Sequence, residues 1–219
     1  MNEDRARQEI CRVGKSLFDR GYVHATAGNI SVRLDDGFLI TPTDACLGFL
    51  QPETLAKVDL AGRQVSGERA SKTLALHRRI YEAQAAVGRP TGCVIHTHST
   101  HCVALTLDEG AGAELLPAVT PYFVMKVGHV PVVPYHRPGD PAVGDVVAAL
   151  VARYAVTPIR AVMLTRLGPN VWHDTPAQAM AVLEELEETA RLWLLSQPKP
   201  RPLTPAAIEE LRVVFGAAW

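Results

Sequence analysis

Apolar residues recur three and four positions apart near the start of the chain, at Ala6, Ile10, Val13 and Leu17. This spacing lines one face of a helix, so it predicts an amphipathic helix over residues 3–20. The same periodicity predicts a long helix over residues 176–195, where a run of glutamates supplies the polar face. Shorter periodic segments predict helices over residues 71–83, 99–107 and 146–154, the first of them with Ser71 as its N-cap.

Short apolar runs bounded by turn residues predict the strands. Residues 29–34 and 38–41 flank Asp35, Asp36 and Gly37, which is a favourable hairpin turn. Residues 93–96 and 161–164 are continuous apolar runs typical of buried strands. Residues 130–134 contain prolines, which favours a position at the edge of a sheet.

The end of the chain is predicted to contain a proline-rich linker over residues 198–202 and a short helix over residues 205–214, capped by Thr204. Strands alternate with helices along the whole sequence, and this order predicts the α/β class. We find no internal repeat, so we expect one domain over residues 1–219.

Composition and charge exclude several classes of protein. Of the 219 residues, 47% are hydrophobic, which is enough to bury a core and too many for a disordered chain. The 22 Lys and Arg residues nearly balance the 23 Asp and Glu residues, so neither nucleic acid nor a membrane is an expected partner. No signal sequence is recognisable, and the four cysteines form no C-x-x-C pair, so we expect a cytoplasmic protein.

The strongest candidate for chemistry is the segment that contains His96, His98 and His101. On an extended chain, His96 and His98 point to the same side and could share one metal ion. The alternative interpretation is that both are buried histidines with hydrogen-bond partners.

Several short loops are rich in groups that could bind an anion. They contain Asn29, Thr43 and the pair Ser71–Lys72, and this pair lies at a predicted helix N-terminus. Ordinary turn chemistry explains any one of them, but together they favour a phosphorylated small substrate. Tyr122 follows a proline in a predicted loop and is a candidate proton donor, although a lone tyrosine is also typical of packing.

These motifs resemble those of the class II aldolase/adducin family. The resemblance rests on Ala27-Gly-Asn-Ile-Ser-Val-Arg, Ile40-Thr-Pro-Thr, Ser71 to His77 and His96-Thr-His98, and it spans about residues 5 to 213. It is closest to the 3-oxo-tetronate 4-phosphate decarboxylase branch, through segments such as Thr120-Pro-Tyr-Phe-Val-Met125 and Val132-Val-Pro-Tyr-His-Arg-Pro-Gly-Asp140.

The resemblance implies an α/β/α sandwich around a mainly antiparallel sheet, and a homotetramer with its sites between subunits. It makes His96 and His98 zinc ligands, and it makes Asn29, Thr43, Ser71 and Lys72 the phosphate-binding residues. Tyr122 corresponds to a family tyrosine that comes from the neighbouring subunit. The catalytic residues expected from it are Tyr122, Lys72 and Thr73.

Two positions depart from the family pattern. Thr73 stands where the family has a catalytic glutamate, and Leu167 stands where it has a third zinc histidine. His101 or His173 could complete the zinc site, as could substrate oxygens or water, and a metal-free enzyme is a further alternative.

The loss of the glutamate favours decarboxylation, because a β-keto acid loses CO₂ without a base that removes a hydroxyl proton. We therefore expect conversion of 3-oxo-tetronate 4-phosphate to dihydroxyacetone phosphate and CO₂ through a metal-stabilised enediolate. One alternative is a sugar-phosphate aldolase or epimerase of the same family. The other is a non-catalytic, adducin-like assembly domain.

Overall fold

The computed structural model describes residues 1–108 and 112–219. Within these residues the strands form one eight-stranded sheet, with the order β4-β3-β2-β1-β5-β8-β7-β6. The strands are β1 (Asn29–Arg33), β2 (Gly37–Ile40), β3 (Ala56–Asp59), β4 (Gln64–Ser66), β5 (Cys93–His96), β6 (Val132–Val133), β7 (Ala161–Leu164) and β8 (Gly168–His173).

Neighbouring strands are antiparallel except for β6 and β7, which are parallel at the sheet edge. The helices are α1 (Glu3–Asp19), α2 (Leu74–Ala86), α3 (Thr100–Ala104), α4 (Ala142–Arg153), α5 (Pro176–Leu195) and α6 (Pro205–Phe215). Two 3₁₀ turns, η1 (Leu47–Phe49) and η2 (Pro52–Thr54), and the π-helical segment η3 (Phe123–Val127) complete the fold. The expected mainly antiparallel α/β/α sandwich is confirmed.

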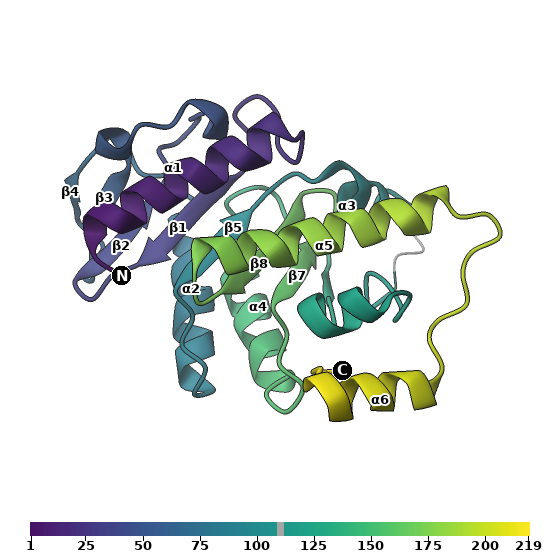
Figure 1. Cartoon of the computed structure of the whole chain (residues 1–219). Coiled ribbons are helices and arrows are strands. Elements are labelled where there is room, and N and C mark those ends of the chain that lie inside the picture. Colours follow the sequence, from purple (N-terminus) through teal and green to yellow (C-terminus); the bar gives the residue numbers. More distant parts are fainter. Residues whose placement is uncertain (109–111) are drawn as a thin grey trace.

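Two apolar cores lie on the two faces of the sheet. The alternation of side chains along each strand separates them: on β5, Cys93 and Ile95 belong to one core, and Val94 belongs to the other. Helices α1 and α5 cover the first face, and α2 and α4 pack together over the second (Figure 1). In the described part of the chain, no helix is both long and apolar enough to cross a membrane.

Most predicted elements are present, with shifted ends. The helix predicted over residues 146–154 begins at Ala142, and the strand predicted over residues 130–134 contains only Val132 and Val133. Helix α6 is capped as predicted, because the Thr204 side chain accepts a hydrogen bond from the Ala207 N–H. Strands β3, β4 and β8 were not predicted from the sequence. Of these, β4 is wholly exposed, and its residues Gln64–Ser66 carry no apolar alternation.

The prediction that Ser71 is the N-cap of α2 is wrong. The helix begins at Leu74, and residues 71–73 form a tight turn in which the Leu74 N–H donates to the Ser71 carbonyl over 3.1 Å. The Ser71 hydroxyl instead accepts from the Thr73 N–H, at 3.4 Å. The turn shifts the helix start by three residues and presents the 71–73 segment at the end of the sheet.

Candidate active site

A cleft of about 900 Å³ opens at the end of the sheet where β1 begins and β5 ends. The turn before α2 and the segment that leads into α4 also line this cleft. Apart from Tyr122, every site residue predicted from the sequence lines this cleft: Asn29, Thr43, Ser71, Lys72, Thr73, His96 and His98. Segments that are up to about seventy residues apart in the sequence therefore meet at one place.

His96 is the last residue of β5 and is buried, with 4% of its surface exposed. Its Nδ1 lies 3.0 Å from the Pro169 carbonyl oxygen, which can only accept a hydrogen bond. Nδ1 therefore carries the proton, and Nε2 keeps a free lone pair. Burial, and secondarily the nearby His98, lower the pKa of His96 to about 4, so the ring is neutral near pH 7.

His98 follows the end of β5 and is exposed. The two ring centroids are 5.1 Å apart, and the ring planes meet at 66°. Partial burial lowers the pKa of His98 as well, with a smaller contribution from His24. The cleft thus holds two adjacent neutral imidazoles, which is the protonation state that a metal ligand requires.

Two glycines allow the chain to come close to this histidine segment. Gly28 has a φ of +87°, and a Cβ there would lie 2.8 Å from the His96 carbonyl oxygen. Gly168 has a φ of +136°, and a Cβ there would lie 1.9 Å from the Thr97 carbonyl oxygen. Because a side chain fits at neither position, both loops can pack directly on the backbone that carries the histidines.

Asn29 and Thr73 join the first strand to the start of α2. The Asn29 amide Nδ2 donates a hydrogen bond to Thr73 Oγ1 over 3.3 Å. Lys72 is exposed in the same turn, immediately before the 13-residue helix α2. This arrangement of a cation, hydroxyl groups and a helix N-terminus favours the binding of an anion.

Three carboxylates in the cleft wall lie beside basic side chains. Arg79 forms ion pairs with Glu82 and Asp145, and His136 lies 3.2 Å from Asp140. Thr73 carries a neutral hydroxyl, so the turn before α2, residues 71–73, offers no carboxylate base.

Tyr122 lies away from the cleft of its own chain. It precedes η3, and 62% of its surface is exposed. Any role in catalysis therefore requires that another copy of the chain bring this residue to the cleft.

The two further histidines considered as third metal ligands do not reach the cleft. His101 Nδ1 lies 2.8 Å from the buried Glu187 carboxylate, on α5. His173 is at the opposite end of β8 and accepts a hydrogen bond from the Asp174 N–H. Within residues 1–108 and 112–219, no group of three or more His, Cys, Asp or Glu side chains is arranged to hold a metal ion.

Asn170 is a cleft residue that the sequence analysis missed. It lies on β8, a strand that was not predicted, and its side chain is fully buried. The available signal was an asparagine inside the largely apolar run from Gly168 to Trp172. Asn170 pairs in register with His96 on β5, so its position could be found only from the sheet.

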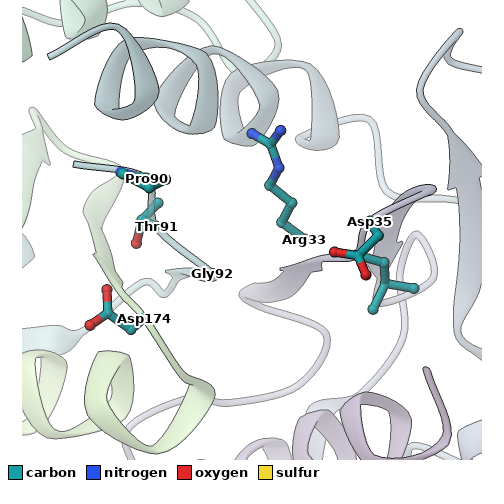
Figure 2. A pocket seen from close by; sticks show the side chains of 7 residues that line it. Arg33, Asp35, Pro90, Thr91, Gly92 and Asp174 are labelled. Carbon is teal, nitrogen blue, oxygen red and sulfur yellow. The ribbon is translucent and has the colours of Figure 1, made fainter. Parts of the chain in front are cut away.

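A second hollow, of about 440 Å³, lies at the other end of the same strands. Its lining includes Arg33, Asp35, Thr91 and Asp174. These side chains do not converge on one point (Figure 2). The hollow holds none of the predicted site residues, so the larger cleft is the candidate active site.

Comparison with known proteins identifies relatives over nearly the whole chain. The model of the class II aldolase and adducin N-terminal domain matches residues 8–194. A curated 3-oxo-tetronate 4-phosphate decarboxylase of Cupriavidus necator is 53% identical over 226 residues, which cover 99% of each chain. An L-fuculose phosphate aldolase of Haemophilus influenzae is 29% identical, over 99% of this chain and 94% of that one.

The crystal structure of YgbL from Klebsiella pneumoniae superposes with a TM-score of 0.87. It is 40% identical and covers 97% of this chain and 100% of its own. YgbL is described as an aldolase, epimerase or decarboxylase.

Proposed function

The chain belongs to the class II aldolase and adducin family, and we propose that it is a carbon–carbon lyase that decarboxylates 3-oxo-tetronate 4-phosphate. The observation that carries this proposal is the 53% identity, over nearly the whole length of both chains, to a curated decarboxylase of that substrate. Thr73 supports it, because the turn before α2 offers no carboxylate to start an aldol cleavage.

Decarboxylation of a β-keto acid does not require an enzyme base to remove a hydroxyl proton. The C1–C2 bond breaks and releases CO₂, while its electron pair forms the C2–C3 double bond and leaves negative charge on the C3 oxygen. A proton then adds to C2 and gives dihydroxyacetone phosphate. The site must therefore stabilise charge on the C3 oxygen and later supply one proton.

His96 and His98 would hold a divalent cation in this site, and zinc is the proposed ion. The residues fit such a role, because the Nδ1–H of His96 donates to the Pro169 carbonyl and leaves Nε2 free. When bound, the cation would supply an electrophile for the 3-oxo group. Two protein ligands leave coordination positions open for substrate or water.

The phosphate is proposed to bind at the turn before α2, where Asn29, Thr43, Ser71 and Lys72 line the cleft. Lys72 supplies the positive charge, and the N-terminus of α2 adds the positive end of the helix dipole. This anchor holds one end of the substrate, so the reacting carbons are placed toward the histidines.

Tyr122 is the proposed proton donor for C2. Because it is exposed in its own chain, the proposal requires a homotetramer in which a neighbouring subunit brings it to the cleft. We further propose a single domain over residues 1–219 and a cytoplasmic location, for which the free thiols of Cys11, Cys46, Cys93 and Cys102 are the support.

The proposal is tested by CO₂ release from 3-oxo-tetronate 4-phosphate, with dihydroxyacetone phosphate measured as the second product. We expect one equivalent of each and a loss of turnover after chelator treatment that added zinc restores. Cleavage of L-fuculose 1-phosphate without CO₂ release would instead assign an aldolase. A protein with no bound metal and no turnover of either compound would be an adducin-like assembly domain.

A further inference from the structure

Asn170 carries an amide group that no residue in the described chain satisfies. Its side chain is 0% exposed, and neither Oδ1 nor Nδ2 has a hydrogen-bond partner within residues 1–108 and 112–219. A buried polar group without a partner is destabilising, because it gives up its hydrogen bonds to water and gains none in the protein. Strand β8 is otherwise apolar at its centre, where an aliphatic residue would avoid this cost.

Asn170 lies beside the candidate metal ligand His96 in the sheet. Asn29 on β1 and Asn170 on β8 both pair in register with His96, one from each side. The three residues therefore form a row across β1, β5 and β8, on the face of the sheet that α2 and α4 cover. All three residues line the cleft.

The neighbouring polar groups in this row are partly occupied. His96 uses Nδ1 on the Pro169 carbonyl, and Asn29 donates through Nδ2 to Thr73. The Asn29 oxygen Oδ1 is unpartnered, but an oxygen can only accept. Within the described row, Asn170 is the residue whose side-chain amide makes no hydrogen bond through either atom.

An amide with both atoms free matches a pair of adjacent oxygens, one that accepts and one that donates. The decarboxylation proposed above produces such a pair, because O3 gains negative charge and O2 remains a hydroxyl. The Nδ2–H group can donate to O3 while Oδ1 accepts from the O2 hydroxyl, as a two-point contact. A donor placed in advance at the developing charge lowers the barrier of the chemical step.

We propose that Asn170 is a catalytic residue whose amide binds the C2 and C3 oxygens of the enediolate. The assignment rests on the proposed decarboxylation. Asn170 transfers no proton in this step: the electron pair of the C1–C2 bond moves toward O3, and the amide stabilises the charge that results. The unsatisfied amide in the free protein is thus a preorganised part of the site.

The first test compares wild type with Asn170→Leu, which has a side chain of similar size and no polar atoms. We expect kcat to fall by about 10²–10³-fold, with KM changed by no more than about threefold. The melting temperature should stay equal or rise, because the substitution removes an unsatisfied buried group. Gln84→Leu, a buried polar residue outside the cleft lining, is the matched control and should keep full kcat.

The second test measures binding to protein loaded with zinc. Phosphoglycolohydroxamate presents two adjacent oxygens and a phosphate, whereas glycerol 3-phosphate carries the phosphate without a planar pair of oxygens. Asn170→Leu should weaken the hydroxamate by at least about tenfold, in proportion to a lost charge-assisted hydrogen bond. Glycerol 3-phosphate should bind equally to both proteins.

Unchanged kcat in Asn170→Leu, or equal weakening of both ligands, would overturn the assignment. A lower melting temperature together with unchanged hydroxamate binding would make Asn170 a structural residue. Retained kcat and tighter zinc binding in Asn170→Asp would make Oδ1 a cation ligand instead. If wild type releases no CO₂, the proposed function fails, and the binding comparison still decides whether Asn170 recognises the oxygen pair.

Discussion

The two ends of strands β1, β5 and β8 differ in whether their polar atoms have hydrogen-bond partners. At the end with Arg33 and Asp174, backbone carbonyls accept hydrogen bonds from nearby donors. The Arg33 N–H donates to the Gly92 carbonyl, and Thr91 Oγ1 donates to the His173 carbonyl. At the end with Asn29 and His96, buried polar atoms remain without partners in the described chain.

Both ends are hollowed, and both carry charged residues, so a hollow alone does not identify a site. The difference lies in the unsatisfied groups. A fold that needs only stability pairs its buried polar atoms, whereas a binding site leaves them free for a ligand. We therefore expect substitutions at the cleft end to affect activity more than stability, and substitutions at the other end to affect neither strongly.

The largest expected effect comes from His96→Ala. It removes the buried imidazole whose tautomer the Pro169 carbonyl fixes, and with it the proposed cation site. We expect kcat/KM for CO₂ release to fall on the order of 10³-fold or more. Metal analysis of the purified variant should find zinc greatly reduced.

A matched control for this variant is His173→Ala, at the far end of β8 and outside the cleft lining. It should retain both zinc and activity. Undiminished turnover in His96→Ala would remove the cation from the mechanism and would weaken the contrast between the two ends.

A smaller effect is expected from acid, through His77 on α2. Burial, followed by the nearby His96, lowers the pKa of His77 from 6.5 to about 3. The unfolded chain therefore binds a proton that the folded chain does not, and stability is lost as pH falls from about 6.5 toward 3. One such group contributes a slope of about 1.4 kcal/mol per pH unit.

The measurement is the unfolding free energy of metal-free protein in urea at pH 7, 6, 5 and 4. His77→Gln should have a shallower slope between pH 6 and 4, by about the contribution of one titrating group. Its amide can still bond the Ser31 hydroxyl that His77 Nδ1 contacts at 2.8 Å. Identical slopes for the two proteins would show that His77 is protonated in the folded state.

The smallest effect is expected at the other hollow. Asp35→Asn and Asp174→Asn remove two carboxylates that line it, and both residues are exposed. Substitutions of this kind change stability by no more than about 0.5 kcal/mol. CO₂ release should stay within about twofold of wild type. A tenfold loss in either variant would mean that the two ends are coupled and that the far end also contributes to activity.

Local patterns were enough to predict much of this fold. The period of Ala6, Ile10, Val13 and Leu17 predicts α1, since a buried helix face must be apolar at that spacing. The apolar run that ends at His96 predicts β5 for the corresponding reason. Strand β4 could not be predicted in this way, because an exposed edge strand carries no apolar pattern.

The sequence by itself determined the types of side chain at the candidate site: two close histidines, a lysine beside small hydroxyl residues, and a threonine in place of a carboxylate. These depend on local spacing and on the identity of each residue. Only the tertiary structure decided that Asn29, His96 and Asn170 form one row, and that His101 and His173 lie outside the cleft. The reason is physical, because pairing between β1, β5 and β8 is a long-range contact whose register no local pattern contains.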